Sequence, residues 1–191
     1  MTDLVATRAD AVASLWPDAE RGALYAVLDA CDEPRVPPLV RELGPALAVS
    51  LYRGAAEADL AAIAPYLVQV TPRVLRWIGE TLWTDPWGIF AVSDAPLEEL
   101  RTHFRKFLLV EAPDGDEWYF RFYDPRVLAN FLPTCDATQL VAFFGPVTRF
   151  AWTDLDTYGV TIAAQQWFDA AAPEPPPAAP PLKPKIVFRR T

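Results

Sequence analysis

Short apolar runs alternate with amphipathic stretches along most of the chain, which predicts strands and helices in turn. The runs 24–28 and 66–70 are typical of buried strands, and residues 72–82 place Leu75, Ile78 and Leu82 on one helical face. Helices are predicted at 4–16, 34–43, 56–64, 72–82, 97–104, from 125, at 137–144 and at 159–170. Strands are predicted at 24–28, 46–52, 66–70, 89–92, 107–110, 118–123 and 147–156.

The stretch from Trp118 to Pro133 is the most informative segment. Its alternating aromatic residues predict a strand buried on both faces, and Asp124 with Pro125 is typical of a helix start. The Pro-Arg-Val triplet of this junction recurs at 34–36 and 72–74, where strands also give way to helices. We therefore interpret the triplet as a helix opener.

Residues 113–116, Pro-Asp-Gly-Asp, indicate a hairpin between the two flanking strands, so one strand pair should be antiparallel. The predicted fold class is α/β: a single mixed β-sheet with helices packed on it, a helical C-terminal segment and a Pro-rich tail. Residues 1–170 are expected to form the α/β domain. Residues 171–191 are expected to be a Pro-rich, basic and flexible tail, because seven of the residues 173–184 are proline.

Hydrophobic residues make up 52% of the chain and aromatic residues 13%, which is typical of a folded protein. The net charge of −8 argues against a nucleic-acid partner, because a phosphate-binding surface needs clustered cations. The sequence shows no signal peptide and no membrane-spanning segment, so we expect a cytoplasmic protein that does not bind membranes. Cys31 and Cys135 are then expected to be reduced.

The inventory of chemical groups favours binding over catalysis. The single histidine, His103, is predicted to lie on the solvated face of its helix. No ligand set for a metal and no phosphate-binding loop is present, and no cofactor is expected. Asp124 and Arg126 could form an acid and an anion clamp in an enzyme, although helix capping already accounts for the acid. Trp83 and Trp87 lie in an aromatic loop where a protein-binding hot spot could also lie.

A series of blocks in the chain resembles a known family over about residues 20–150. The blocks are Leu24–Asp29, Pro65–Val68, Trp87–Asp94, Leu97–Arg101, Phe107–Val110, Phe120–Val127, Phe131–Pro133 and Phe143–Pro146. In this order they look like the type VI secretion effector chaperones, or adaptors, long catalogued as a domain of unknown function. Many of those relatives continue into a longer C-terminal helical lobe, whereas this chain enters its Pro-rich tail.

The resemblance implies a non-catalytic cytoplasmic protein that binds a cognate effector protein and helps load it onto the VgrG spike protein. From their chemistry, the residues expected to bind partners are Trp83, Trp87, Arg121, Tyr123 and Arg126. Two alternatives stay open. An immunity protein would bind the active domain of a toxin, and an enzyme would hold Asp124, Arg126 and Arg121 in a deep polar pocket beside a small molecule.

Overall fold

The computed structural model describes residues 4–5, 8–111, 115–153 and 160–164. Seven of its strands form one sheet in the order β1-β9-β8-β5-β2-β4-β3, and every neighbouring pair in it is antiparallel. The strands are β1 (Leu4–Val5), β2 (Leu24–Asp29), β3 (Ala48–Ser50), β4 (Pro65–Gln69), β5 (Gly88–Val92), β8 (Arg149–Thr153) and β9 (Val160–Ala164). A separate two-stranded ribbon consists of β6 (Leu109–Glu111) and β7 (Glu117–Tyr119).

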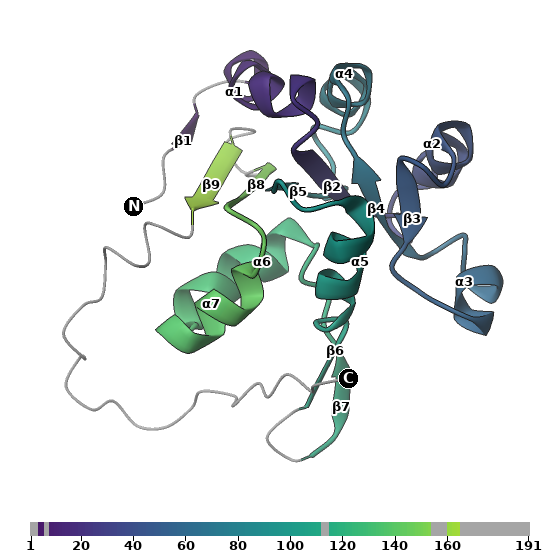
Figure 1. Ribbon diagram of the computed structural model, residues 1–191, viewed down its shortest axis with the longest axis vertical. Coiled ribbons are helices and arrows are strands. Elements are labelled where there is room, and N and C mark those ends of the chain that lie inside the picture. The colour runs from purple at the N-terminus through teal and green to yellow at the C-terminus, as the bar shows by residue number, and fades with distance from the viewer. Residues whose placement is uncertain (1–3, 6–7, 112–114, 154–159, 165–191) are drawn as a thin grey trace.

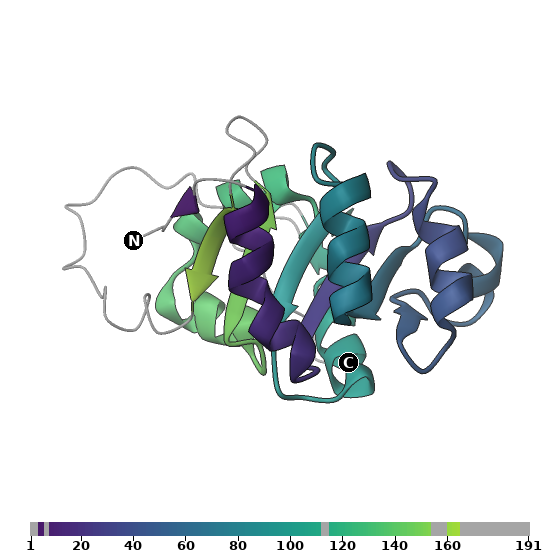
Figure 2. The same cartoon turned by 90° about the horizontal axis from the view of Figure 1, so that it is seen from above.

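Helices cover both faces of the sheet, so the α/β fold class is confirmed. The helices are α1 (Arg8–Glu20), α2 (Val36–Leu43), α3 (Ala55–Asp59), α4 (Pro72–Thr81), α5 (Leu97–Arg105), α6 (Pro125–Phe131) and α7 (Ala137–Phe144), with a 3-10 turn at Leu132–Thr134. Figure 1 shows α1 and α4 on one side of the sheet and α5, α6 and α7 on the other. In Figure 2 the helices α1 and α4 run across the strands that they cover.

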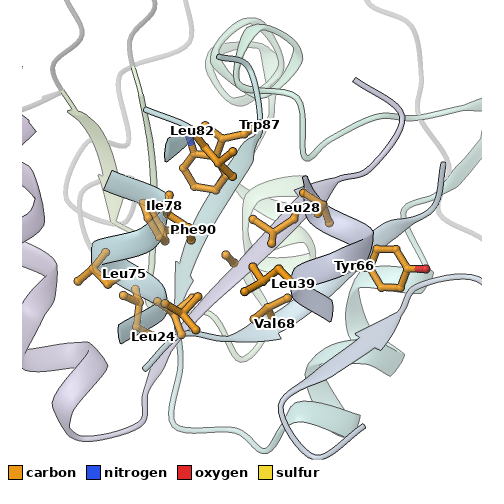
Figure 3. Packing of buried hydrophobic residues seen from close by; sticks show 14 of the residues in the cluster. Leu24, Leu28, Leu39, Tyr66, Val68, Leu75, Ile78, Leu82, Trp87 and Phe90 are labelled. Carbon is orange, nitrogen blue, oxygen red and sulfur yellow. The ribbon is translucent and has the colours of Figure 1, made fainter. Parts of the chain in front are cut away.

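The face under α1, α2 and α4, which we call the aliphatic face, is packed mainly with branched and small side chains. Leu24, Ala26 and Leu28 of β2 point to this face because alternate residues of a strand share a side. Leu75 and Ile78 of α4 meet them, as Figure 3 shows. All five of these residues are fully buried, so this layer fixes the helices α1 and α4 to the centre of the sheet.

The opposite face, which we call the aromatic face, is packed with phenylalanine rings. Phe143 of α7 lies at its centre, with ring-centroid distances of 5.1 Å to Phe107, 5.3 Å to Phe131 and 5.2 Å to Phe150. Phe122 adds a further ring at 5.9 Å. Edge-to-face and tilted contacts of this kind contribute about 0.5–1.5 kcal/mol per pair beyond area burial. The helices α5, α6 and α7 are therefore joined through one ring cluster.

The Pro-Arg-Val triplet opens two of the three helices as predicted. The helix α6 has Asp124 as its N-cap and α4 has Thr71, and both begin at the proline. The helix α2 instead begins at Val36, and its N-cap residue Arg35 makes no side-chain cap. The capping box of Asp136 and Gln139 on α7 is present as the sequence indicates.

The expected mixed sheet is corrected to an antiparallel one. The helices α2 and α4 are crossovers, but each joins two strands that are separated by a third. The strands β2 and β3 run in the same direction with β4 inserted between them. The strands β4 and β5 also run in the same direction, with β2 inserted between them. This is a split β-α-β arrangement. Sequence periodicity identifies the crossover helix but not which strand is inserted.

Both ends of the domain also differ from the prediction. Leu4–Val5 is a strand rather than helix, and α1 runs from Arg8 through Pro17, because Leu15 and Ala19 on either side of the proline are buried against the sheet. Residues 160–164 form β9 rather than a helix, since the β-branched run at 160–162 pairs with β8. Residues 165–170 of the predicted helix, and the tail 171–191, lie outside the described residues.

Two further local predictions are wrong. The segment after residue 117 is a strand only to Tyr119, and Trp118 and Tyr119 are 55% and 42% exposed, because β7 belongs to the separate ribbon rather than to the main sheet. His103 is buried rather than solvated. Its Nε2 lies 2.8 Å from the carbonyl oxygen of Phe143, and its ring packs against Phe107.

Candidate functional site

A cluster of charged side chains lies where the end of β2 meets the start of α6. At its centre is Arg121, in the segment between β7 and α6. Its Nη2 donates to a carboxylate oxygen of Asp29 and, at 2.7 Å, to Asp32, and it lies 3.9 Å from Asp124. Asp29 is fully buried at the end of a central strand, so the guanidinium balances a carboxylate that has no access to water. The cluster thereby joins segments about 90 residues apart.

The second part of the cluster is the helix start itself. The Asp124 carboxylate accepts the backbone N–H of Arg126 at 2.9 Å and the Nη2 of the same residue at 2.6 Å. Burial of Asp124 acts to raise the pKa of its carboxyl group, but the hydrogen bonds from Arg126 outweigh it, and the pKa is lowered. The pKa of Arg126 is raised by the same pairing with Asp124. Both groups are therefore charged near neutral pH.

The start of α2 repeats this arrangement. Glu33 is buried, accepts the backbone N–H of Arg35 at 2.9 Å, and pairs with the guanidinium of the same residue. In both places an acid, a proline and an arginine form one closed unit in which the arginine binds the acid two positions before it. Arg35 is 44% exposed and Arg126 is 55% exposed, so both present part of a guanidinium to the surface.

A chain of tyrosine hydroxyl groups extends from the cluster toward the β6–β7 ribbon. The hydroxyl of Tyr52 lies 3.0 Å from that of Tyr119, which lies 3.2 Å from that of Tyr123. Burial is the largest influence on Tyr119 and Tyr123, and the pKa of each is raised above its ordinary value of 10. The hydroxyl groups of Tyr119 and Tyr123 therefore stay protonated and serve as neutral hydrogen-bonding groups.

This arrangement is suited to holding and presenting charge rather than to moving protons. A general acid or base needs a pKa near the working pH, whereas the shifts of Asp124 and of both tyrosines lead away from neutrality. Two surface hollows have volumes of about 570 and 640 Å³, and neither is lined by Asp124, Arg121 or Arg126, although Tyr52 and Tyr119 line the larger one. Among the described residues, no group of three or more His, Cys, Asp or Glu side chains is arranged to hold a metal ion.

The structure brings together three of the five residues that the sequence nominates for partner binding. Arg121, Tyr123 and Arg126 belong to the cluster, although Tyr123 is buried. Trp83 and Trp87 do not belong to it. They are 4% and 1% exposed in the aliphatic core, where Figure 3 shows Trp87 beside Leu82 and Phe90. Both indoles fill the end of that core, so little of either side chain reaches the surface.

Sequence reasoning missed two members of the cluster, Asp29 and Asp32. A signal was available for Asp29, since it directly follows a strand that is apolar throughout. A carboxylate at the end of a fully buried strand is itself buried, and a buried carboxylate requires a cationic partner. Asp32 carries no comparable signal, because it lies in an ordinary surface loop.

Residues 24–142 match the family model described as Domain of unknown function (DUF4123). The chain belongs to this family. The region that matches DUF4123 begins with β2 and ends within α7, so it contains every residue of the cluster, whereas β1, β8 and β9 lie outside it. No curated protein and no solved structure gives a significant match to the chain. No described helix of this DUF4123 protein has the length and apolar character needed to cross a membrane.

Proposed function

We propose that this protein is a non-catalytic adaptor that binds a type VI secretion effector in the cytoplasm and helps load it onto the VgrG spike. The observation that carries the proposal is the DUF4123 match over residues 24–142, the region whose blocks resemble the effector chaperones. The site is compatible with this role. Arg121 and Arg126 are held in fixed positions by buried or half-buried carboxylates and remain part-exposed for a partner.

Co-expression with a cognate effector, encoded beside a spike gene, tests the proposal. We expect the two proteins to co-purify and the effector to become more soluble, because binding covers effector surface that otherwise aggregates. An effector that is equally soluble and equally well delivered without this protein would contradict the proposal.

Arg126→Ala tests whether the cluster contributes to capture. The Arg126 side chain is 55% exposed, and the buried Asp124 keeps the backbone N–H of residue 126 and the nearby Arg121, so the change should lower the free energy of unfolding by about 1 kcal/mol. Arg35→Ala is the matched control, because it removes an arginine from the equivalent acid-Pro-Arg unit at the start of α2. We expect Arg126→Ala alone to weaken effector or spike capture in a pull-down. If the variant binds normally but its free energy of unfolding falls by several kcal/mol, Arg126 instead belongs to a structural ion pair.

Domain mapping distinguishes the adaptor from the immunity alternative. An adaptor should bind an effector fragment that contains the delivery region and lacks the toxin domain. An immunity protein should bind the isolated toxin domain and block its activity. The enzyme alternative predicts turnover of a small molecule that is lost in Asp124→Asn, with the fold retained.

A further inference from the structure

A groove of about 640 Å³ lies between the end of α5, the segment after β3 and the β6–β7 ribbon. Figure 1 shows the ribbon extending away from the main sheet beyond the end of α5. One wall contains Arg105 and Lys106, and the other contains Leu109 and Tyr119, which are direct cross-strand partners. The groove is separate from the residues that hold Arg121 and Arg126.

One end of the groove carries cationic side chains that form no ion pair with a carboxylate of the described residues. Neither Arg53 nor Lys106 has an ion pair among the described residues, and both are exposed. Arg105 donates its Nε to the carbonyl oxygen of Leu51 at 2.9 Å rather than to a carboxylate. Burial, followed by the nearby charges of Arg53 and Arg101, lowers the pKa of Arg105. Arg53 and Arg101 thus repel the charge of Arg105, and Glu57 offsets part of that repulsion.

The local charge differs from that of the neighbouring surface and of the whole chain. Arg101, one turn earlier on α5, is bound by Glu57 at 3.0 Å and also lies near Glu98. The full chain carries −8. An uncompensated basic patch in an acidic protein attracts an acidic ligand and orients it, because the rest of the surface repels such a ligand.

The opposite wall supplies apolar contact. Leu109 is 52% exposed and Tyr119 is 42% exposed, and their side chains share one face of the ribbon. The hydroxyl of Tyr119 is bonded to its tyrosine neighbours, so the ring is fixed. A fixed aromatic ring beside an exposed leucine is a suitable contact for an aliphatic or aromatic side chain.

We propose that this groove binds an acidic segment of a partner protein that also carries an aliphatic or aromatic side chain. Its carboxylates would lie beside Arg53, Arg105 and Lys106, and its apolar side chain would lie on Leu109 and Tyr119. The inference rests on the proposed function in one respect, that the partner is a protein; an adaptor's effector is the source of the segment.

The groove also gives the bound segment a direction. Glu111 and Glu117 face each other two positions further along the ribbon, which is about 6–7 Å from the Leu109–Tyr119 pair. Carboxylates at that end repel acidic residues of the ligand, and the cations at the other end attract them. The acidic residues therefore lie toward α5.

Fluorescence anisotropy tests the inference with a labelled peptide in which Glu alternates with Leu and Phe. The full chain should bind this peptide with an affinity that falls as salt is added, and should not bind the same peptide with Lys in place of Glu. Arg53→Gln with Lys106→Gln should weaken binding roughly tenfold. Arg41→Gln with Arg73→Gln removes the same charge from exposed positions on α2 and α4 and should leave binding unchanged. Leu109→Ser should also weaken it.

Three results would overturn the inference: no binding of the acidic peptide by the wild-type chain, equal weakening by the two charge pairs, or tighter binding of a single-stranded oligonucleotide than of the peptide. A pull-down separates this outcome from that of the proposed function. If the Arg53→Gln, Lys106→Gln variant captures the effector as well as the wild type does, the proposal for the groove is wrong and the proposed adaptor role stands. If the wild type captures no effector but binds the peptide, the adaptor role is wrong and the groove stands.

Discussion

Helices cover both faces of the sheet, but the buried side chains on the two faces are of different types. Leu, Ile, Val and Ala side chains dominate under α1, α2 and α4, where one phenylalanine is buried, whereas seven phenylalanine rings are buried under α5, α6 and α7. The aliphatic face touches the partner-binding candidates only through Trp83 and Trp87, which are buried. The charged cluster, the tyrosine chain and the basic groove all adjoin the aromatic face. The surfaces that we propose for partner binding therefore lie on one side of the sheet.

Replacing one central residue on each face tests this difference most strongly. Phe143→Ala removes a ring with several aromatic neighbours, and we expect it to lower the free energy of unfolding by about 3–5 kcal/mol. Leu75→Ala on the aliphatic face should cost about 2–5 kcal/mol, and less than Phe143→Ala, because a smaller cavity remains. Urea unfolding measures both. A double-mutant cycle of Phe143 and Phe150 should show coupling of about 0.5–1.5 kcal/mol. Equal losses without coupling would mean that the rings act only by their volume.

The N-caps of α6 and α4 give a smaller contrast between the faces. Asp124 is buried and accepts three hydrogen bonds from Arg126, whereas Thr71 accepts one bond of 3.4 Å from Val74. Asp124→Ala should cost about 1–2 kcal/mol and Thr71→Ala about 0.5 kcal/mol, within the usual range for N-caps. Asp124→Asn serves as the control, because it can still accept the backbone N–H. A larger loss of unfolding free energy from Thr71→Ala than from Asp124→Ala in the same assay would contradict this prediction.

The chain's single histidine gives the aromatic face a pH dependence that the aliphatic face lacks. Burial, the largest influence, lowers the pKa of His103 from its ordinary value of 6.5. Between 6.5 and the lowered pKa the unfolded chain holds more protons than the folded one, so stability falls as the pH falls through this window. Thermal melts from about pH 7.5 to about pH 5.5 should show that fall, and His103→Gln should flatten it. An equal fall in the variant would assign the effect to other groups.

Sequence patterns identified the elements better than their partners. Apolar runs located β2, β4 and β5, and Asp124 and Asp136 identified two helix starts, because these signals act within a few residues. The prediction of strand direction was wrong because the insertion of β4 between β2 and β3 depends on packing between distant segments. His103 was misplaced for a similar reason. Charged neighbours at 101, 105 and 106 indicate a solvated face, but α7 and the turn at Gly145 cover the ring.

The candidate site could be predicted only in part. Arg121, Tyr123 and Arg126 are close in sequence and proved close in space. Asp29 and Asp32 reach Arg121 across about 90 residues, and the groove joins the ends of α5 and β3 with the ribbon. Patterns within a short stretch of sequence do not predict contacts between such distant residues. Trp83 and Trp87 were nominated for partner binding by analogy with hot spots, although large aromatic residues are more often buried, as these two are.

Removing residues 173–191 should have the smallest effect of all. The Pro-rich sequence is expected to add no packed core to either face, so truncation at Ala172 should leave the melting temperature within measurement scatter. Circular dichroism melts of the two chains measure this. A much lower melting temperature for the truncated chain would show that the tail packs on one of the faces, and would move the domain boundary.

The pairing of β1 with β9 sets an order of events during synthesis. Val5 pairs with Val160, so β1 waits for 155 further residues before its partner exists. The strands β2, β3, β4 and β5 all lie within residues 24–92 and can pair long before then. Translation therefore completes the centre of the sheet first and this edge last. Until β8 has been made, the growing chain exposes an open strand edge beside β5, which is the stage at which a nascent chain is most exposed to misassembly.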